Sequence, residues 1–250
     1  MKPIAVFRHS PTEGPGYFGT FLDRAGMPWQ LVRVDAQDPI PARADEFSGL
    51  VFMGGPMSVN DDLPWIVPAL KLIRDAVAKD VPVLGHCLGG QLMAKALGGL
   101  VGRASFKEIG WGEVRIGTDE IAQAWFGAQR TAFDTFHWHG ETFTIPAGSQ
   151  RVLSSAWCKN QGFALGPHLG LQCHIEMTAE LVHSWCASGQ DEIAHSHSPA
   201  VQSVPAILAD LEQRLGALHE VADAVYARWL EGCNRAEFSR GSFRTAAESR

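Results

Sequence analysis

Short apolar runs alternate with amphipathic stretches along the N-terminal part of the chain, and this alternation restricts the fold more than any other feature. The runs are rich in β-branched residues and are bounded by Gly, Pro or Asp, as buried strands are. The stretches between them place apolar residues at helical spacing. Strands that alternate with helices form a parallel sheet, so we predict an α/β fold with a doubly wound, mainly parallel sheet. The predicted strands are 4–7, 31–34, 49–53 and 81–84, and the predicted helices are 18–25 and 65–78.

The second half of the chain is predicted to be rich in strands. Apolar residues alternate or cluster there in several runs, which are separated by turn signals such as the Pro and Gly of 145–148. The predicted strands are 112–116, 135–143, 151–157 and 169–175.

A regular apolar stripe follows near the C-terminal end. From Val204 to Trp229 apolar residues repeat at spacings of three and four, which predicts one long amphipathic helix. We expect its apolar face to pack on the core or on another subunit, which is compatible with a homo-oligomer, and the alternative is recruitment of a partner protein. The polar tail 234–250 is predicted to be peripheral.

The composition narrows the class of protein. With 250 residues, of which 46% are hydrophobic and 19% charged, the chain can bury a sizeable core. A net charge of −6 with scattered Lys and Arg argues against nucleic acid as a partner. We see neither a signal-peptide pattern nor an apolar stretch of the ~20 residues that a membrane span needs, and we expect a soluble cytoplasmic protein. The five cysteines are widely spaced without a CxxC pair, so we expect reduced thiols.

One cysteine has an unusual setting. The predicted strand 81–84 runs into G-H-C-L-G-G at 85–90, and 91–97 is helical in composition. A G-x-C-x-G sequence at a strand-to-helix turn is the thiol counterpart of the nucleophile elbow. The helix N-terminus favours the thiolate of Cys87, and the backbone N–H of Leu88 could serve as one donor of an oxyanion hole.

A glycine pair follows another predicted strand. Strand 49–53 leads into Gly54 and Gly55, where backbone N–H groups can approach a ligand because no Cβ is in the way. Gly55 could supply the second oxyanion donor, although an ordinary glycine turn would read the same. Both loops leave the carboxyl ends of predicted parallel strands, where such sheets place their ligand crevices.

His174 and Glu176 are two residues apart at the end of the apolar run that predicts strand 169–175. Because residues i and i+2 of a strand project from the same face, Glu176 could orient His174. His174 could then take the thiol proton and later protonate a leaving amine. By itself, such a pair is more often a surface pair or a buried core histidine.

Taken in order and spacing, the three motifs resemble the class I glutamine amidotransferases over residues 1–190. The motifs are M-G-G-P at 53–56, G-H-C-L-G-G-Q at 85–91 and L-Q-C-H-I-E at 171–176. The resemblance implies that family's doubly wound fold, here with an added C-terminal helix. Segments 108–112 and 136–141 are similar to stand-alone members related to the amidotransferase part of GMP synthase.

The same resemblance implies the roles of individual residues. Cys87 would form a γ-glutamyl thioester and His174 and Glu176 would complete the triad, while Gln91 would bind substrate. Gly55, with Gly54 beside it, and Leu88 would provide the oxyanion site. Ile175 and Cys173 stand where the family usually has Pro and Phe, which leaves the acceptor substrate open.

Two H-x-H pairs could in principle bind zinc. They are His137 with His139 and His195 with His197. No cysteine pair accompanies them and the mechanism needs no metal, so we predict neither metal nor cofactor. We expect His137 or His139 to line the pocket or pack beside Trp138, and the second pair to lie in a polar loop.

The predicted function is hydrolysis of the glutamine side-chain amide, with release of glutamate and ammonia. The chain has no room for a synthetase domain and no Walker-type loop, so the acceptor would belong to a synthetase subunit in trans. Alternatives are an independent γ-glutamyl peptide hydrolase on the same triad and a non-catalytic binding protein of the same fold. We predict an amidotransferase-like domain at 1–190, with 191–250 as a helical extension and polar tail packed on it.

Overall fold

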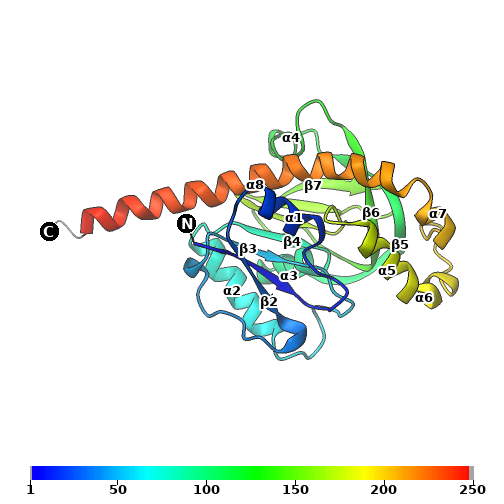
Figure 1. The fold of residues 1–250 in the computed structure, drawn as a ribbon, viewed down its shortest axis with the longest axis horizontal. Coiled ribbons are helices and arrows are strands. Elements are labelled where there is room, and N and C mark those ends of the chain that lie inside the picture. Colours follow the sequence, from blue (N-terminus) through cyan, green and yellow to red (C-terminus); the bar gives the residue numbers. More distant parts are fainter. Residues whose placement is uncertain (1, 248–250) are drawn as a thin grey trace.

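The computed structural model describes the backbone of residues 2–247 and the side chains of residues 2–234. The side chains of most of the predicted polar tail therefore lie outside the described residues. Within the described part, nine strands form one sheet in the order β2-β1-β3-β4-β9-β8-β7-β5-β6 (Figure 1). The strands are β1 (Ile4–Arg8), β2 (Trp29–Arg33), β3 (Gly49–Phe52), β4 (Val83–His86), β5 (Val101–Ile116), β6 (Ala132–Phe143), β7 (Gln150–Ser155), β8 (Gly162–Leu165) and β9 (His168–Leu171).

The predicted α/β fold with a parallel central sheet is confirmed. Strands β2, β1, β3, β4 and β9 pair in parallel, whereas β8, β7, β5 and β6 extend the sheet by antiparallel pairing. The carboxyl ends of β1, β3, β4 and β9 therefore meet at one edge. Strand β8 was not predicted, because its four residues carry too short a pattern to separate from the flanking turns.

Helices cover both faces of the sheet, because neighbouring strand residues point to opposite sides. Ile4 and Val6 of β1 belong to one buried cluster, together with residues of α1 and α8, whereas Ala5 and Phe7 belong to the other, with residues of α2 and α3. The helices are α1 (Gly16–Arg24), α2 (Ile66–Ala78), α3 (Leu88–Ala96), α4 (Glu120–Phe126), α5 (Ala179–Ser188), α6 (Gln190–Ala194), α7 (Val204–Leu208) and α8 (Leu211–Ala247).

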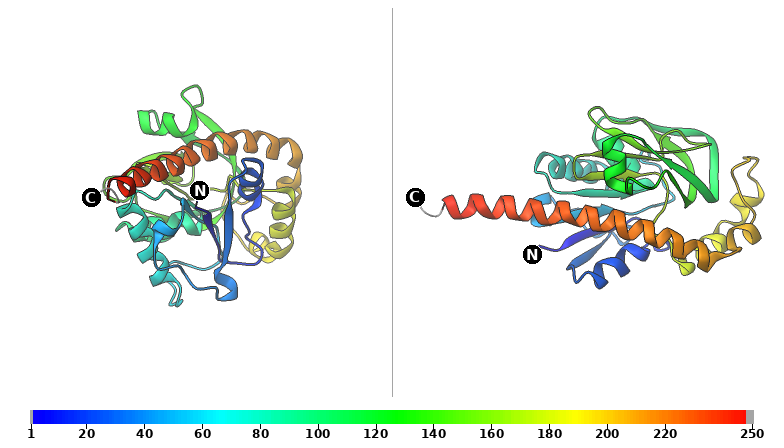
Figure 2. Two further views of the ribbon diagram at one scale, coloured as in Figure 1. Left: turned by 60° about the vertical axis from the view of Figure 1, so that its left-hand side comes forward. Right: turned by 90° about the horizontal axis from the view of Figure 1, so that it is seen from above.

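The prediction of one continuous helix from 204 to 229 was wrong. The helix is interrupted at Ala209, which is extended, and Asp210, which has a φ of 53° in the left-handed region that Asp tolerates better than most residues. Helix α8 then runs along the body and projects beyond it (Figure 2). The predicted packing of the apolar stripe on the core is confirmed. Its members Val204 and Leu208 are partly buried, and the others are buried: Leu211, Leu215, Leu218, Ala222, Val225 and Trp229.

The boundary between 1–190 and 191–250 remains a prediction, and α8 shares one buried cluster with the sheet. Cys87, Cys158, Cys173 and Cys186 have free thiols, as expected. None of the helices in residues 2–247 combines the length and apolarity that crossing a bilayer requires.

Candidate active site

Cys87 lies on a sharp turn between β4 and α3. Its backbone has φ 50° and ψ −106°, a conformation outside both the helical and the strand region. The glycines that follow allow α3 to approach the sheet, because a Cβ at Gly89 would collide with the carbonyl of Phe52 and one at Gly90 with that of Leu171. The turn therefore has the geometry that the elbow motif predicts.

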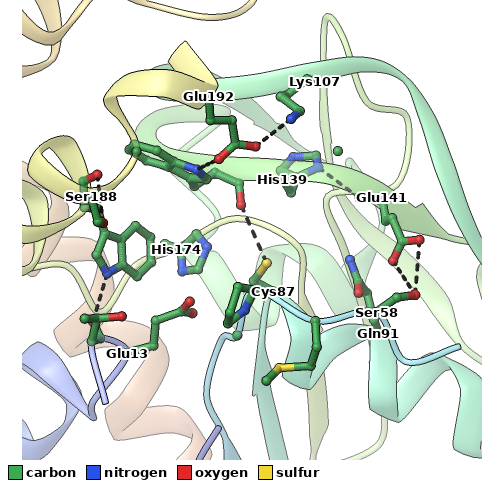
Figure 3. A pocket seen from close by; sticks show the side chains of 18 of the residues that line it. Glu13, Ser58, Cys87, Gln91, Lys107, His139, Glu141, His174, Ser188 and Glu192 are labelled. Carbon is green, nitrogen blue, oxygen red and sulfur yellow. Dashed lines mark hydrogen bonds and ion pairs between the residues drawn. The ribbon is translucent and has the colours of Figure 1, made fainter. Parts of the chain in front are cut away.

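His174 and Glu176 are next to each other and almost completely buried. The Nδ1 of His174 lies 2.6 Å from Oε1 of Glu176, and none of the described residues forms a hydrogen bond with its Nε2. In Figure 3 the imidazole lies beside Cys87. Trp185 packs edge-on against the imidazole with ring centroids 4.9 Å apart, which fixes the plane of the ring.

The expectation that both residues lie within a strand was wrong. Strand β9 ends at Leu171, and the segment beyond it pairs with β6 only at one bridge. There the backbone N–H of His174 donates to the carbonyl of Phe136 (2.8 Å), and the hydroxyl of Thr135 donates to the carbonyl of His174 (2.8 Å). Contacts with strand β6 therefore position His174, whereas the sequence pattern predicted that its own strand would do so.

The electrostatics of this pair favour an ion pair. Burial opposes protonation of His174, but Glu176 and Cys87 together outweigh it and raise the pKa of His174 well above its usual range. Burial likewise disfavours the charged form of Glu176, yet His86 and His174 lower the pKa of Glu176 to about 2. At neutral pH the imidazole is therefore protonated and the carboxylate ionised.

A second histidine lies beneath the pair. His86 is completely buried, and its Nε2 is 3.8 Å from Oε2 of Glu176 and 3.2 Å from the hydroxyl of Tyr226. Burial lowers the pKa of His86. Because Tyr226 belongs to α8, the C-terminal helix contacts the histidine that lies next to Glu176.

The residues predicted for the oxyanion site come together near Cys87. Leu88 is the first residue of α3, and the N–H groups of a first helical turn have no acceptor within the helix. A Cβ at Gly55 would come within 2.6 Å of the Leu88 side chain, so the two loops are in contact. Gly54 packs against His174, whose Cε1 would be 3.3 Å from a Cβ at that position.

Gln91 is buried at the pocket wall and is linked to the cysteine through a second amide. Its Nε2 donates to Oε1 of Gln172 (3.1 Å), and Nε2 of Gln172 lies 3.5 Å from the sulfur of Cys87. Sequence reasoning gave Gln172 no role. The only sequence feature that could have indicated a role for Gln172 is its position two residues before His174. Its proximity to Cys87 comes from the pairing of β4 with β9, which the sequence pattern does not reveal.

The pocket over Cys87 has a volume of about 610 Å³ and contains several carboxylates (Figure 3). The one lysine in its lining, Lys107, pairs with Glu192 at 2.5 Å, and Glu192 also accepts a hydrogen bond from the indole of Trp138 (2.9 Å). Glu141 accepts a hydrogen bond from the hydroxyl of Ser58 (2.9 Å). The remaining acidic residues in the lining are Glu13 and Asp61.

The two predicted H-x-H pairs differ in surroundings. His139 lines the pocket, whereas His137 is buried behind it, where burial lowers the pKa of its imidazole to about 4. Glu108, which sequence reasoning did not place there, completes a group whose possible ligand atoms all lie within 4.8 Å of one another. Both carboxylate oxygens of Glu108 already accept hydrogen bonds, from Ser155 (2.8 Å) and Gln161 (2.7 Å), so the group is a hydrogen-bonded network. His195 and His197 are exposed and do not line the pocket.

Comparison with known proteins gives the family. The model of the family described as glutamine amidotransferase class-I matches residues 21–184, so the chain belongs to this family. A crystal structure of a glutamine amidotransferase from Methylobacillus flagellatus is 47% identical, with a TM-score of 0.90 over 93% of this chain and 95% of that one.

Two curated relatives differ in what their names describe. γ-Glutamyl peptidase 3 of Arabidopsis thaliana is 29% identical over 67% of this chain and 71% of its own length. The glutamine-hydrolysing GMP synthase of Azoarcus sp. strain BH72 is 30% identical over 72% of this chain but only 37% of its own length. The predicted resemblance is thereby confirmed, including its relation to GMP synthase.

Proposed function

We propose that the protein is a glutaminase-type cysteine hydrolase, with Cys87 as the nucleophile and His174 and Glu176 as the other triad members. The observation that carries the proposal is the buried ion pair of His174 and Glu176 beside a cysteine at a strained strand-to-helix turn. A protonated imidazole stabilises a neighbouring thiolate, which is the nucleophilic form of cysteine.

The first half-reaction forms a thioester. The Cys87 thiolate attacks the side-chain carbonyl carbon of a γ-glutamyl amide, and the N–H groups of Gly55 and Leu88 stabilise the negative charge that develops on oxygen. Protonated His174 gives its proton to the amide nitrogen as the carbon–nitrogen bond breaks. Ammonia leaves, and the γ-glutamyl group stays on sulfur.

The second half-reaction restores the enzyme. Neutral His174 takes a proton from water, the hydroxide formed attacks the thioester carbon, and the carbon–sulfur bond breaks. Glutamate leaves, while the thiolate and the protonated imidazole are regenerated. Glu176 stays ionised throughout and holds the imidazole in position, as the triad carboxylate does in other hydrolases.

The fate of the ammonia separates two versions of this function. The similarity to GMP synthase supports transfer to an acceptor held by a synthetase on another chain. The similarity to γ-glutamyl peptidase 3 supports independent hydrolysis of γ-glutamyl peptides. A pocket of about 610 Å³ falls within the ~300–1,000 Å³ that holds drug-sized ligands, so it admits substrates larger than glutamine.

The test is steady-state release of glutamate from glutamine and from γ-glutamyl dipeptides by the isolated protein. Wild-type protein is compared with Cys87→Ala and with Cys186→Ala, which removes another buried thiol, outside the pocket lining. We expect Cys87→Ala alone to abolish turnover. Turnover that survives this substitution would contradict the assigned nucleophile, and a wild-type protein silent on both substrates would contradict independent hydrolysis.

A further inference from the structure

Glu13 lines the pocket, although none of the sequence motifs includes it. It belongs to the loop between β1 and α1, where its backbone N–H donates to the carbonyl of Ser10 (3.0 Å). The loop leads into the first turn of α1, which is bound to the segment of His174 and Glu176, since the backbone N–H of Tyr17 donates to the carbonyl of Glu176 (2.8 Å). Gly16 permits this approach with a φ of 51°, because a Cβ there would collide with the same carbonyl.

The carboxyl group of Glu13 lies on the His174 side of the pocket. A Cβ at Gly54 would collide with its Oε2 and would be 3.3 Å from Cε1 of His174, so both groups pack over the same glycine. Figure 3 shows the side chain directed toward His174 and Cys87. Among the described residues, no hydrogen bond uses this carboxyl group, in contrast to those of Glu141 and Glu192.

The surroundings of Glu13 make its carboxyl group able to give up a proton at neutral pH. Burial raises the pKa of Glu13 to about 7, with protonated His174 opposing this rise and Glu176 adding to it. Cys87 is the third ionisable group on this side of the pocket. Elsewhere in the lining, Lys107 and Glu192 are paired with each other.

We propose that Glu13 protonates the amine that leaves the substrate, an inference that rests on the proposed hydrolysis of γ-glutamyl amides. His174 delivers its proton to the departing nitrogen, so the amine is released beside His174, where the Glu13 carboxyl group lies. The amine takes a second proton from this carboxyl group and leaves as an ammonium ion, while the Glu13 carboxylate regains its proton from solvent.

This proton transfer has a favourable direction and a consequence for function. Alkylamines such as the lysine side chain have pKa values near ~10.4, well above that of a carboxyl group that titrates around neutrality. Once protonated, the amine has lost its nucleophilic electron pair and cannot attack the thioester again. Glu13 therefore selects substrates with a basic leaving amine and suits release into solvent better than transfer of neutral ammonia to an acceptor.

The experiment compares glutamine with glutamate γ-methyl ester, whose alcohol leaving group takes no second proton. For Glu13→Gln we expect kcat/KM for glutamine to fall about 100-fold, the lower range for loss of a general acid. The value for the ester should stay within about threefold, since the steps that Glu13 does not serve are intact. In the wild-type protein, kcat/KM for glutamine should also fall as the pH rises through the Glu13 pKa, and this fall should be absent from the variant.

The control is Glu180→Gln, which makes the same chemical change at an exposed position in the first turn of α5. Equal losses on both substrates, or no loss on glutamine, would overturn the role of Glu13 while leaving the triad mechanism intact. A wild-type protein that hydrolyses neither compound would overturn the proposed function and this inference with it. Thermal unfolding of both variants identifies any loss that comes from misfolding.

Discussion

Replacing Glu176 by Gln should remove the charge that keeps His174 protonated, while preserving the shape of the side chain. The pKa of Glu176 stands at about 2 instead of 4.5, because His86 and His174 outweigh the cost of its burial. Since one pKa unit corresponds to ~1.4 kcal/mol, the ionised carboxylate is favoured by roughly 3 kcal/mol. Loss of stabilisation of this size would shift the protonation equilibrium of His174 about 100-fold toward the neutral imidazole.

Two assays follow the loss. The rate of Cys87 alkylation by iodoacetamide at neutral pH reports the thiolate, and kcat/KM for glutamine reports the reaction. For Glu176→Gln we expect both to fall, by up to about 100-fold, because a thiolate next to neutral histidine is less stable. The Glu180→Gln control should match wild-type protein. Alkylation of Glu176→Gln at the wild-type rate would show that the charge of Glu176 does not maintain the ion pair.

Three further predictions concern the elbow, α8 and acid stability. Gly89→Ala should lower the free energy of unfolding by about 1–3 kcal/mol and slow Cys87 alkylation, because the added Cβ collides with Phe52. Gly102→Ala, where the added Cβ meets open space, should do neither. Equal losses of stability of the two variants in urea unfolding would contradict this prediction. Tyr226→Phe should cost about 1 kcal/mol of stability and reduce kcat/KM a few-fold through the lost hydrogen bond to His86, and an unchanged kcat/KM would disconnect α8 from the triad. Burial lowers the pKa of His9, His137 and His168 from 6.5 to about 4. Between pH 6.5 and about 4, these histidines are therefore neutral in the folded state but protonated in the unfolded state. The free energy of unfolding should therefore fall with decreasing pH in this range, by up to about 4 kcal/mol per pH unit, and a flat profile in urea titrations would contradict the assignment.

The elbow could be predicted because its information is local. A strand pattern, G-x-C-x-G-G and a helical pattern follow one another directly, and the glycines are required where α3 crosses Phe52 and Leu171. The parallel pairing of β1, β3 and β4 also follows from alternating strands and helices. Patterns of this kind determine which elements form and which of their ends meet.

The remaining parts of the site depend on contacts between distant segments. Glu13 reaches the pocket because its loop leads into α1, whose Tyr17 N–H donates to the carbonyl of Glu176. Glu108 meets His139 through the pairing of β5 with β6. His86 occupies the variable position of the elbow motif, so its contact with Tyr226 carries no local signal. The break at Asp210 was missed because the apolar spacing continues across it even though the backbone does not remain helical.

The most direct test of the central claim is intact-mass measurement of the protein quenched in acid during turnover of glutamine. We predict one γ-glutamyl adduct, located by peptide mapping to the peptide that contains Cys87 and absent from Cys87→Ala. Turnover of glutamine without an adduct on Cys87, or with the adduct on another cysteine, would contradict the thioester mechanism.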